Sequence, residues 1–298
     1  MDILWIQQGT VSAVAPSELH VYASRNDGLL WVDLPSFDEV ALQRLASLFK
    51  LHSSALKLCR EPTFMPKLRM YDEYLFVILF APVQGGSGNI HALELNYFAS
   101  YRFLITVHAP TAADVSSAQL MEQTKLIKRR MTAGHFVPHS IPELTHAIIS
   151  NYAARQEAVV EKLAQQVAVC EERVLTSTFK KPEQELERMF RIRHELLKVR
   201  TMAATSREMY AQTLARAHLL PSDAKGHLQD LVDQFERVRC LCDGEKEFLQ
   251  SVVDFYQTRI STRINLATER LALLSAVFLP ITAISGIFGM NVVVNTNS

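Results

Sequence analysis

The sequence predicts an α/β domain at the N-terminus, followed by a stalk of long helices that leads into a transmembrane helix. Three observations predict this order. Short apolar runs bounded by glycine and proline fill the first third of the chain, strand-like runs stop near Pro142, and residues 271–298 contain no charge. Short apolar runs of this kind indicate strands, whereas a long uncharged run is typical of a membrane span.

Composition excludes several classes of protein. Lys+Arg and Asp+Glu both number 31 in the 298 residues, so the formal net charge is zero. A nucleic-acid binder normally carries a basic excess on at least one domain, so we expect no nucleic acid as a partner. The four cysteines are too few for a disulfide framework. No nucleophile–base pair and no phosphate-binding glycine motif stands out, so we expect neither an enzyme nor a prosthetic group.

Residues 1–140 are expected to form the α/β domain, with a mixed or antiparallel sheet. Ser36 followed by Glu39 resembles a capping box that opens a helix. Ser53 or Ser54 is expected to cap a second short helix that ends near Cys59. The expected strands are residues 1–6, 29–34, 90–98 and 102–107, together with two runs within 68–83. Residues 71–73 separate these two runs.

Three long helical segments follow, separated by single prolines. The first two, expected at about 143–179 and 183–219, form an antiparallel helical pair within 141–221. The third opens at the capping pair Ser222 and Asp223, and its apolar residues recur every three or four positions. Residues 222–270 form a stalk that continues into the span. A helix of ~66 residues is ~100 Å long and cannot lie inside a compact domain.

Residues 271–291 are expected to be the first transmembrane helix, since about 20 apolar residues cross a bilayer. Three arginines precede the span and no cation follows it. The positive-inside tendency therefore places the N-terminal domain in the cytoplasm. We expect the span to lie in the cell inner (plasma) membrane. Pro280 lies within the span, where neighbouring helices or hydroxyls can satisfy the freed carbonyl, and Thr282 and Ser285 lie nearby. A buried core helix is the alternative.

One side of the span carries small and hydroxyl-bearing side chains. Steps of three and four residues connect Asn265, Thr268, Ala272, Ser275, Leu279, Thr282 and Gly286. Such a stripe serves either helix packing in lipid or the wall of a water-filled axis between several copies. In the second interpretation Asn265 forms a polar ring at the inner end, Leu271 or Leu279 a hydrophobic constriction, and Asn291 a carbonyl ring at the outer mouth.

The end of the span resembles a known family. Residues 278–291 read Phe-Leu-Pro-Ile-Thr-Ala-Ile-Ser-Gly-Ile-Phe-Gly-Met-Asn. This string resembles the CorA family of magnesium/cobalt (divalent metal cation) transporters, in which Gly-Met-Asn closes the first transmembrane helix. A weaker resemblance covers nearly the whole chain, including residues 74–79, 101–107, 229–233 and 248–265.

The resemblance implies a homopentameric, funnel-shaped and channel-like transporter in the lipid bilayer, which carries magnesium and often cobalt or nickel. Gly289, Met290 and Asn291 would form the outer mouth, and Asn265 matches a polar residue at the inner end of the pore. Magnesium releases its water shell reluctantly. A ring of neutral amides can accept hydrogen bonds from those waters without removing them, whereas a ring of carboxylates could hold the ion too tightly.

The resemblance also concerns regulation and the extent of the chain. Asp254 and Asp230 match acidic positions that join the family's cytoplasmic ion sensing, and a solvated helix face is the alternative for each. The family pattern has an acidic loop and a second membrane helix after the Gly-Met-Asn motif, whereas this sequence ends at Ser298. We therefore expect the sequence to be a truncated form that lacks the second transmembrane helix.

Two alternative functions remain open from the sequence. A zinc-transporting branch of the same superfamily typically has a different middle residue in the motif, so Met290 favours magnesium. The other alternative is a tail-anchored coiled-coil scaffold that assembles partners and transports nothing.

Overall fold

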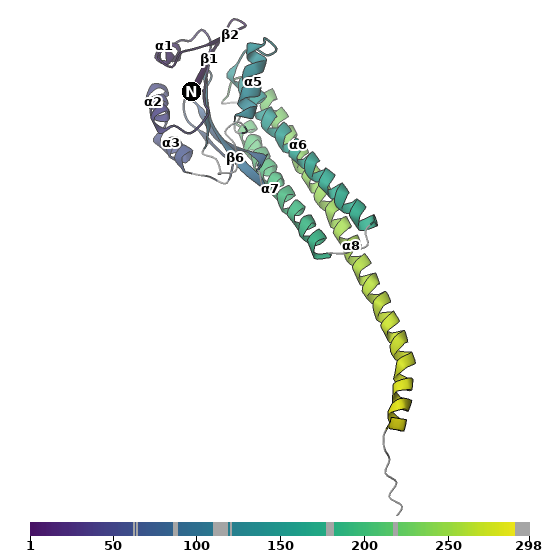
Figure 1. The fold of residues 1–298 in the computed structure, drawn as a ribbon. Coiled ribbons are helices and arrows are strands. Elements are labelled where there is room, and N and C mark those ends of the chain that lie inside the picture. Colours follow the sequence, from purple (N-terminus) through teal and green to yellow (C-terminus); the bar gives the residue numbers. More distant parts are fainter. Residues whose placement is uncertain are drawn as a thin grey trace, which may run out of the picture.

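The fold combines a curved sheet, several short helices and three long helices, one of which projects far beyond the rest (Figure 1). The computed structural model describes residues 1–61, 63, 65–85, 89–109, 119, 121–176, 182–216 and 220–289. The expected α/β domain followed by long helices is confirmed.

The sheet has seven strands in the order β2-β1-β3-β7-β6-β5-β4. Neighbouring strands are antiparallel except β3 and β7, which pair in parallel. The sheet is therefore mixed, one of the two expected forms. The bounds are β1 Asp2–Gln7, β2 Thr10–Ala13, β3 Leu29–Leu34, β4 Lys67–Met70, β5 Leu75–Gln84, β6 Ile90–Ala99 and β7 Phe103–His108.

Helices cover both faces of the sheet. Successive strand residues point to opposite faces, so Ile3 and Trp5 pack in one hydrophobic cluster while Leu4 and Ile6 pack in another. The first cluster includes side chains from α1 (Leu19–Ala23), α2 (Glu39–Phe49) and α3 (Ser53–Arg60). The second joins the sheet to α5 (Glu122–Thr132) and to the long helices.

The capping residues of two short helices differ from the expectation. Asp38, not Ser36, caps α2, because its Oδ1 accepts hydrogen bonds from the backbone nitrogens of residues 40 and 41, at 3.0 and 3.1 Å. His52, not Ser53 or Ser54, caps α3 through Nδ1. An acceptor placed one residue before the first helical turn satisfies its free N–H groups, and the serines are not at that position.

The long helices are α6 (Ile141–Thr176), α7 (Pro182–Leu214) and α8 (Ala224–Gly289). Contacts between α6 and α8 join residue 146 to 230, 150 to 234 and 174 to 259, so these two helices run in the same direction. Contacts of α7 join residue 200 to 243 and 207 to 236, so α7 runs in the opposite direction. The three long helices that the sequence predicts are therefore present.

Apolar side chains hold the bundle together over the first half of α8. Val199, Phe235 and Tyr256 are almost fully buried in the same cluster. From residue 261 to residue 289 every residue of α8 is exposed. The second half of this helix therefore lies outside the bundle, as Figure 1 shows.

Candidate functional site

The projecting half of α8 is the candidate site. Among the described helices, α8 is the one that is long and apolar enough to cross a membrane, and none of its most apolar stretch is buried within the chain. The large side chains on it, such as Leu273 and Phe288, are 63% and 86% exposed. A core helix would bury these groups, so the alternative of a buried core helix does not describe this segment.

The hydroxyl groups on the stripe bond back to their own helix. The side chains of Thr268, Ser275 and Thr282 donate to the carbonyl oxygens four residues earlier, at 2.8–2.9 Å. Each hydroxyl proton is thereby engaged, and the oxygen lone pairs remain to accept a hydrogen bond. The stripe therefore presents acceptors, which suit the hydrogens of the water around a cation.

The remaining stripe residues are also accessible. Leu271 and Leu279 are 64% and 68% exposed. Asn265, which lies about four helical turns before Leu279, is exposed as well. An added Cβ at Gly286 or at Gly289 would meet no atom within 4 Å. Gly289 is the last residue that the structure describes, and Met290 and Asn291 lie outside the described residues.

Pro280 lies inside α8 and frees the carbonyl of Ala276, four residues earlier. Thr282, one of the two hydroxyl residues near this proline, does not donate to this oxygen. The Thr282 hydroxyl donates instead to the carbonyl of Phe278, at 2.8 Å. A hydroxyl in a helix reaches the carbonyl of the residue four positions before it, and Ala276 is six positions before Thr282.

The two aspartates that the resemblance assigns to ion sensing are far apart on α8. They are separated by 24 residues, or about 36 Å along a helix. Asp254 is exposed and accepts a hydrogen bond from Gln250, at 2.8 Å. Asp230 accepts from His146 Nε2 at 2.6 Å and from Gln234 Nε2 at 2.7 Å. Within the described residues of one chain, no three His, Cys, Asp or Glu side chains are placed to hold a metal ion.

A buried polar cluster, which the sequence did not reveal, joins the sheet to α5. Asp33 on β3 accepts hydrogen bonds from Thr106 at 2.6 Å and from Lys128 at 2.5 Å, and His108 Nε2 lies 3.1 Å away. Burial opposes ionisation of Asp33, but the hydrogen bonds and charges of His108 and Lys128 outweigh it and hold the pKa of Asp33 well below its usual value. The cluster therefore positions α5 on the sheet.

Ion pairs fix α7 along the stalk. Asp243 of α8 accepts from Arg200 of α7 at 2.5 Å and from Arg239 of α8 at 2.8 Å. Glu236 pairs with Arg239 at 2.6 Å and with Arg207 of α7 at 3.2 Å. A hydrogen bond from Arg239 lowers the pKa of Glu236 to about 2. These ion pairs join α7 to the first half of α8.

Comparison with known proteins identifies the family. A family model described as CorA-like Mg2+ transporter protein matches residues 26–297. The chain belongs to this family. Members of the CorA family are channel-like transporters and not enzymes.

Two curated relatives carry names that describe transport. YfjQ of Bacillus subtilis (strain 168), named for metal ion transport, is 22% identical over 263 residues, which cover 88% of this chain and 78% of the relative. The cobalt/magnesium transport protein CorA of Thermotoga maritima is 20% identical over 268 residues, which cover 88% of this chain and 72% of the relative. The chain is thus a divalent metal transporter of the CorA family.

Solved structures have the same fold. The full-length CmaX protein matches with a TM-score of 0.80 and 18% identity, over 100% of this chain and 89% of that one. The CorA magnesium transporter of Methanocaldococcus jannaschii matches with a TM-score of 0.79 and 16% identity, over 98% and 87%. The ZntB cytoplasmic domain of Vibrio parahaemolyticus matches with a TM-score of 0.68 and 10% identity, over 88% and 98%.

Proposed function

We propose that copies of this chain form a homopentameric pore that carries magnesium, and also cobalt or nickel, across the cell inner membrane. The N-terminal sheet and the helical bundle lie in the cytoplasm. The observation that carries the proposal is the second half of α8, which leaves the bundle fully exposed and combines apolar faces with one stripe of small polar residues. An apolar face suits lipid, whereas a polar stripe suits a water-filled axis.

The stripe is the proposed wall of the pore. Asn265 forms a ring of amides at the inner end, and Leu271 and Leu279 form the constrictions that exclude water when the pore is closed. Between them the hydroxyl oxygens of residues 268, 275 and 282 accept hydrogen bonds from the hydration shell. Gly289, Met290 and Asn291 form the outer mouth. Hydrogen bonds to the hydration shell allow magnesium to pass with its water in place.

Exposed apolar side chains support assembly into a ring. Leu241, Phe248 and Phe255 recur at intervals of seven residues on one side of α8, and they are 40–46% exposed. Phe190 and Leu197 recur at the same interval on α7, and they are 54% and 51% exposed. Two different patches on one chain favour a head-to-tail contact, and repetition of such a contact closes a ring.

Asp254 lies on the inward continuation of the stripe. Steps of three and four residues lead from Asn265 through Ser261 and Thr258 to Asp254, all of them exposed. Copies of α8 around an axis would place a ring of carboxylates there, ahead of the amide ring. We assign to this ring, and to Asp230 further down the stalk, the regulatory binding of divalent cations. The described residues of a single chain bring together no group of three His, Cys, Asp or Glu side chains for such an ion, so ligands from neighbouring copies are part of the proposal.

Ion uptake into proteoliposomes tests the proposal. The full-length transporter should be offered Mg2+, Co2+, Ni2+ and Zn2+ one at a time, and its oligomeric state in detergent should be measured in parallel. Uptake of Mg2+ by a pentamer is the expected result. Uptake of Zn2+ alone would contradict the choice of ion and favour the zinc branch, for which the likeness to the ZntB domain provides support. A monomer without uptake would contradict the pore and favour the scaffold.

A further inference from the structure

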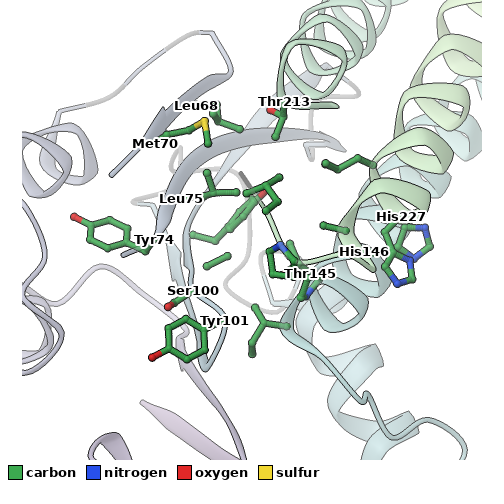
Figure 2. Close-up of a pocket in the computed structure, with 18 of the residues that line it drawn as sticks. Leu68, Met70, Tyr74, Leu75, Ser100, Tyr101, Thr145, His146, Thr213 and His227 are labelled. Atoms are coloured by element: carbon green, nitrogen blue, oxygen red, sulfur yellow. The ribbon is translucent and has the colours of Figure 1, made fainter. Parts of the chain in front are cut away.

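A cavity lies where the sheet meets the base of the helical bundle (Figure 2). Its volume is about 220 Å3. A cavity of about 150 Å3 is sufficient for benzene, so this one accommodates a molecule of about ten heavy atoms. Strands β4, β5 and β6 contribute one side of its lining, and α6, α7 and α8 contribute the other.

The buried part of the lining is apolar. Tyr97 and Tyr210 are 4% and 1% exposed, and their hydroxyl oxygens lie 3.1 Å apart in one hydrogen bond. Many of the other lining side chains are aliphatic, such as Leu68, Leu75, Ile149 and Leu231. Because the two tyrosine hydroxyls bond to each other, an occupant meets mainly carbon surface here and needs an apolar body.

One edge of the cavity is acidic. Asp72 and Glu73, in the turn between β4 and β5, line it and are exposed. Among the described residues that line the cavity there is no lysine and no arginine. Two carboxylates without a cation in the lining favour a positively charged group at this edge. Because this edge is open to solvent, such a group keeps part of its hydration, which reduces the cost of removing it from water.

Aromatic rings at the same edge also suit a cation. Tyr71, Tyr74 and Tyr101 line the cavity close in sequence and space to the two carboxylates. The guanidinium of Arg102, which is outside the lining, lies 5.1 Å from the ring centroid of Tyr101 and donates to Asn26. One of these rings therefore already contacts a cation. The face of an aromatic ring attracts a cation within about 6 Å, so the rings add to the attraction of the carboxylates.

The edge formed by α6 and α8 offers an uncharged hydrogen-bonding group. His146 Nε2 lies 2.6 Å from Asp230 Oδ2, so this imidazole is already engaged. The ring of His227 packs against it, with centroids 4.8 Å apart (Figure 2). Thr145 of α6 lines the cavity, and its buried Oγ1 has no hydrogen-bond partner among the described residues.

The Thr145 hydroxyl indicates a second polar group on the occupant. A buried hydroxyl without a partner is uncommon in folded proteins. Another hydroxyl suits it, because each of the two can donate to or accept from the other. In Figure 2, Thr145 lies across the cavity from Ser100 and Tyr101, which belong to the acidic edge. The two polar ends of the occupant are therefore on opposite sides of its apolar body.

We propose that this cavity binds a small organic amine that has an apolar body and a hydroxyl group at the end opposite the amine. The ammonium lies beside Asp72 and Glu73. The body lies against Tyr97 and Tyr210, and the hydroxyl bonds to Thr145 Oγ1. A site of this kind, apolar with a few convergent polar groups, is typical of small-molecule recognition.

The cavity adjoins the beginning of α8. Ala224, His227 and Leu231 of that helix line it together with strand residues such as Leu75. An occupant therefore contacts both the sheet and the helix that carries the proposed pore stripe. Regulation of transport by the ligand rests on the proposed function, whereas binding of the ligand does not.

Binding to the full-length protein in lipid nanodiscs, measured by isothermal titration calorimetry against empty nanodiscs, tests the inference. The probes are tyramine, phenethylamine without the hydroxyl, 4-ethylphenol without the amine, and 3-(4-hydroxyphenyl)propionate with a negative charge in place of the positive one. We expect tyramine to bind at least tenfold more tightly than 4-ethylphenol and several-fold more tightly than phenethylamine, and the propionate to bind most weakly. Absence of tyramine binding at millimolar concentration, or equal affinity for the amine and the propionate, overturns the proposal.

Neutral variants of the acidic edge test the position of the ammonium. Asp72→Asn combined with Glu73→Gln should lower the affinity for tyramine at least tenfold and leave that for 4-ethylphenol unchanged. Glu161→Gln combined with Glu172→Gln removes two exposed carboxylates of α6 that do not line the cavity and should leave both affinities unchanged. An equal loss of tyramine affinity in the two double variants would show that only the overall charge matters, and would overturn the site.

Variants of the wall locate the body and the hydroxyl. Ala99→Leu places a larger side chain on the cavity wall and should abolish binding, whereas Ala92→Leu, at an exposed position of the same strand, should retain it. Thr145→Val keeps the shape and should lower the affinity for tyramine several-fold but not that for phenethylamine. Tyramine binding that survives both Ala99→Leu and Thr145→Val overturns the proposed site. These readouts do not involve ion uptake, so failure of the pore proposal would leave them unchanged.

Discussion

The carboxylate of Asp33 lies 2.5 Å from the ammonium nitrogen of Lys128, although the side chain of Asp33 is only 1% exposed. This ion pair connects β3 in the middle of the sheet to α5. The ammonium of Lys128 also lies 2.6 Å from the carboxylate of Asp2 on β1, so this one cation pairs with residues of two neighbouring strands, β1 and β3. Removal of one member of a buried pair leaves the other charge without compensation, which typically costs about 3–5 kcal/mol.

Asp33→Asn should therefore destabilise the protein. We expect the free energy of unfolding to fall by about 3 kcal/mol, at the lower end of that range, because Asp2 still neutralises Lys128. Urea denaturation followed by circular dichroism measures the change. Asp38→Asn, which keeps the cap acceptor of α2, is the control and should change stability little. A loss below about 1 kcal/mol for Asp33→Asn would show that the ion pair contributes little.

The lowered pKa of Asp33 predicts that the free energy of unfolding depends on pH in the acid range. The pKa of Asp33 in the folded protein is lower than its ordinary value, so ionised Asp33 stabilises the fold at every pH above about 4. As the pH falls from about 4 towards the lowered pKa, the unfolded chain takes up the proton first and this stabilisation is lost. Urea midpoints between about pH 2 and 6 should therefore fall less steeply for Asp33→Asn than for the natural sequence. Parallel curves would contradict the assignment.

Gly28 occupies a position where a side chain does not fit. An added Cβ would lie 2.5 Å from the Trp5 ring and 2.7 Å from the carbonyl oxygen of Ile6. Gly28→Ala should lower the free energy of unfolding by about 1–3 kcal/mol, since overpacking forces a buried ring to move. Gly226→Ala in the first turns of α8 meets no atom within 4 Å and should be neutral or slightly stabilising. A thermal melt of both variants checks the difference.

The hydrophobic constriction can be tested by a pair of substitutions on opposite sides of α8. Leu279→Ser should admit water to the axis and raise the resting ion leak of proteoliposomes several-fold. Ile281→Ser changes a residue of similar exposure on a lipid-facing side and should leave the leak unchanged. Equal leaks for the two variants would place Leu279 against lipid or against another helix.

Asn291→Ala in the full-length transporter should abolish uptake of Mg2+, because the outer ring of amides that receives the hydrated ion is lost. Size-exclusion chromatography should show the same oligomer as the natural sequence. Val292→Ala, the neighbouring position, serves as the control and should keep most of the uptake. Normal uptake by Asn291→Ala would remove this residue from the outer mouth.

Much of the fold follows from the sequence because the signals are local. Apolar runs of strand length predict most of the strands in the first part of the chain, and the helical spacing of apolar residues predicts the long helices in the second part. Both predictions lie within a few residues of the observed bounds. The short elements β2 and α1 were not predicted, because Thr10–Ala13 and Leu19–Ala23 carry weak periodicity. The cap of α2 was misplaced because Ser36, followed by Glu39, matches a capping pattern, whereas Asp38 is the residue that directly precedes the helix.

The site was predictable only where it lies on one helix. The stripe from Asn265 to Gly286 is a property of spacing, so the sequence alone brings its members to one side. The cluster around Asp33 joins residues 75 and 95 positions apart, and no local pattern connects them. The same holds for the cavity between the sheet and the base of the bundle, whose lining combines Thr145 of α6 with residues of β4, β5, β6, α7 and α8.

The 29 residues of α8 beyond residue 260 extend about 43 Å without support from their own chain. A small change in the angle of the helix at residue 260 therefore produces a larger displacement at its far end. A tilt of about 3° where the helix leaves the bundle displaces its far end by about 2 Å, close to the distance between a magnesium ion and its bound water. In the proposed pore, slight changes of angle in the soluble body would thus be large enough, at the far end, to change whether a hydrated ion fits.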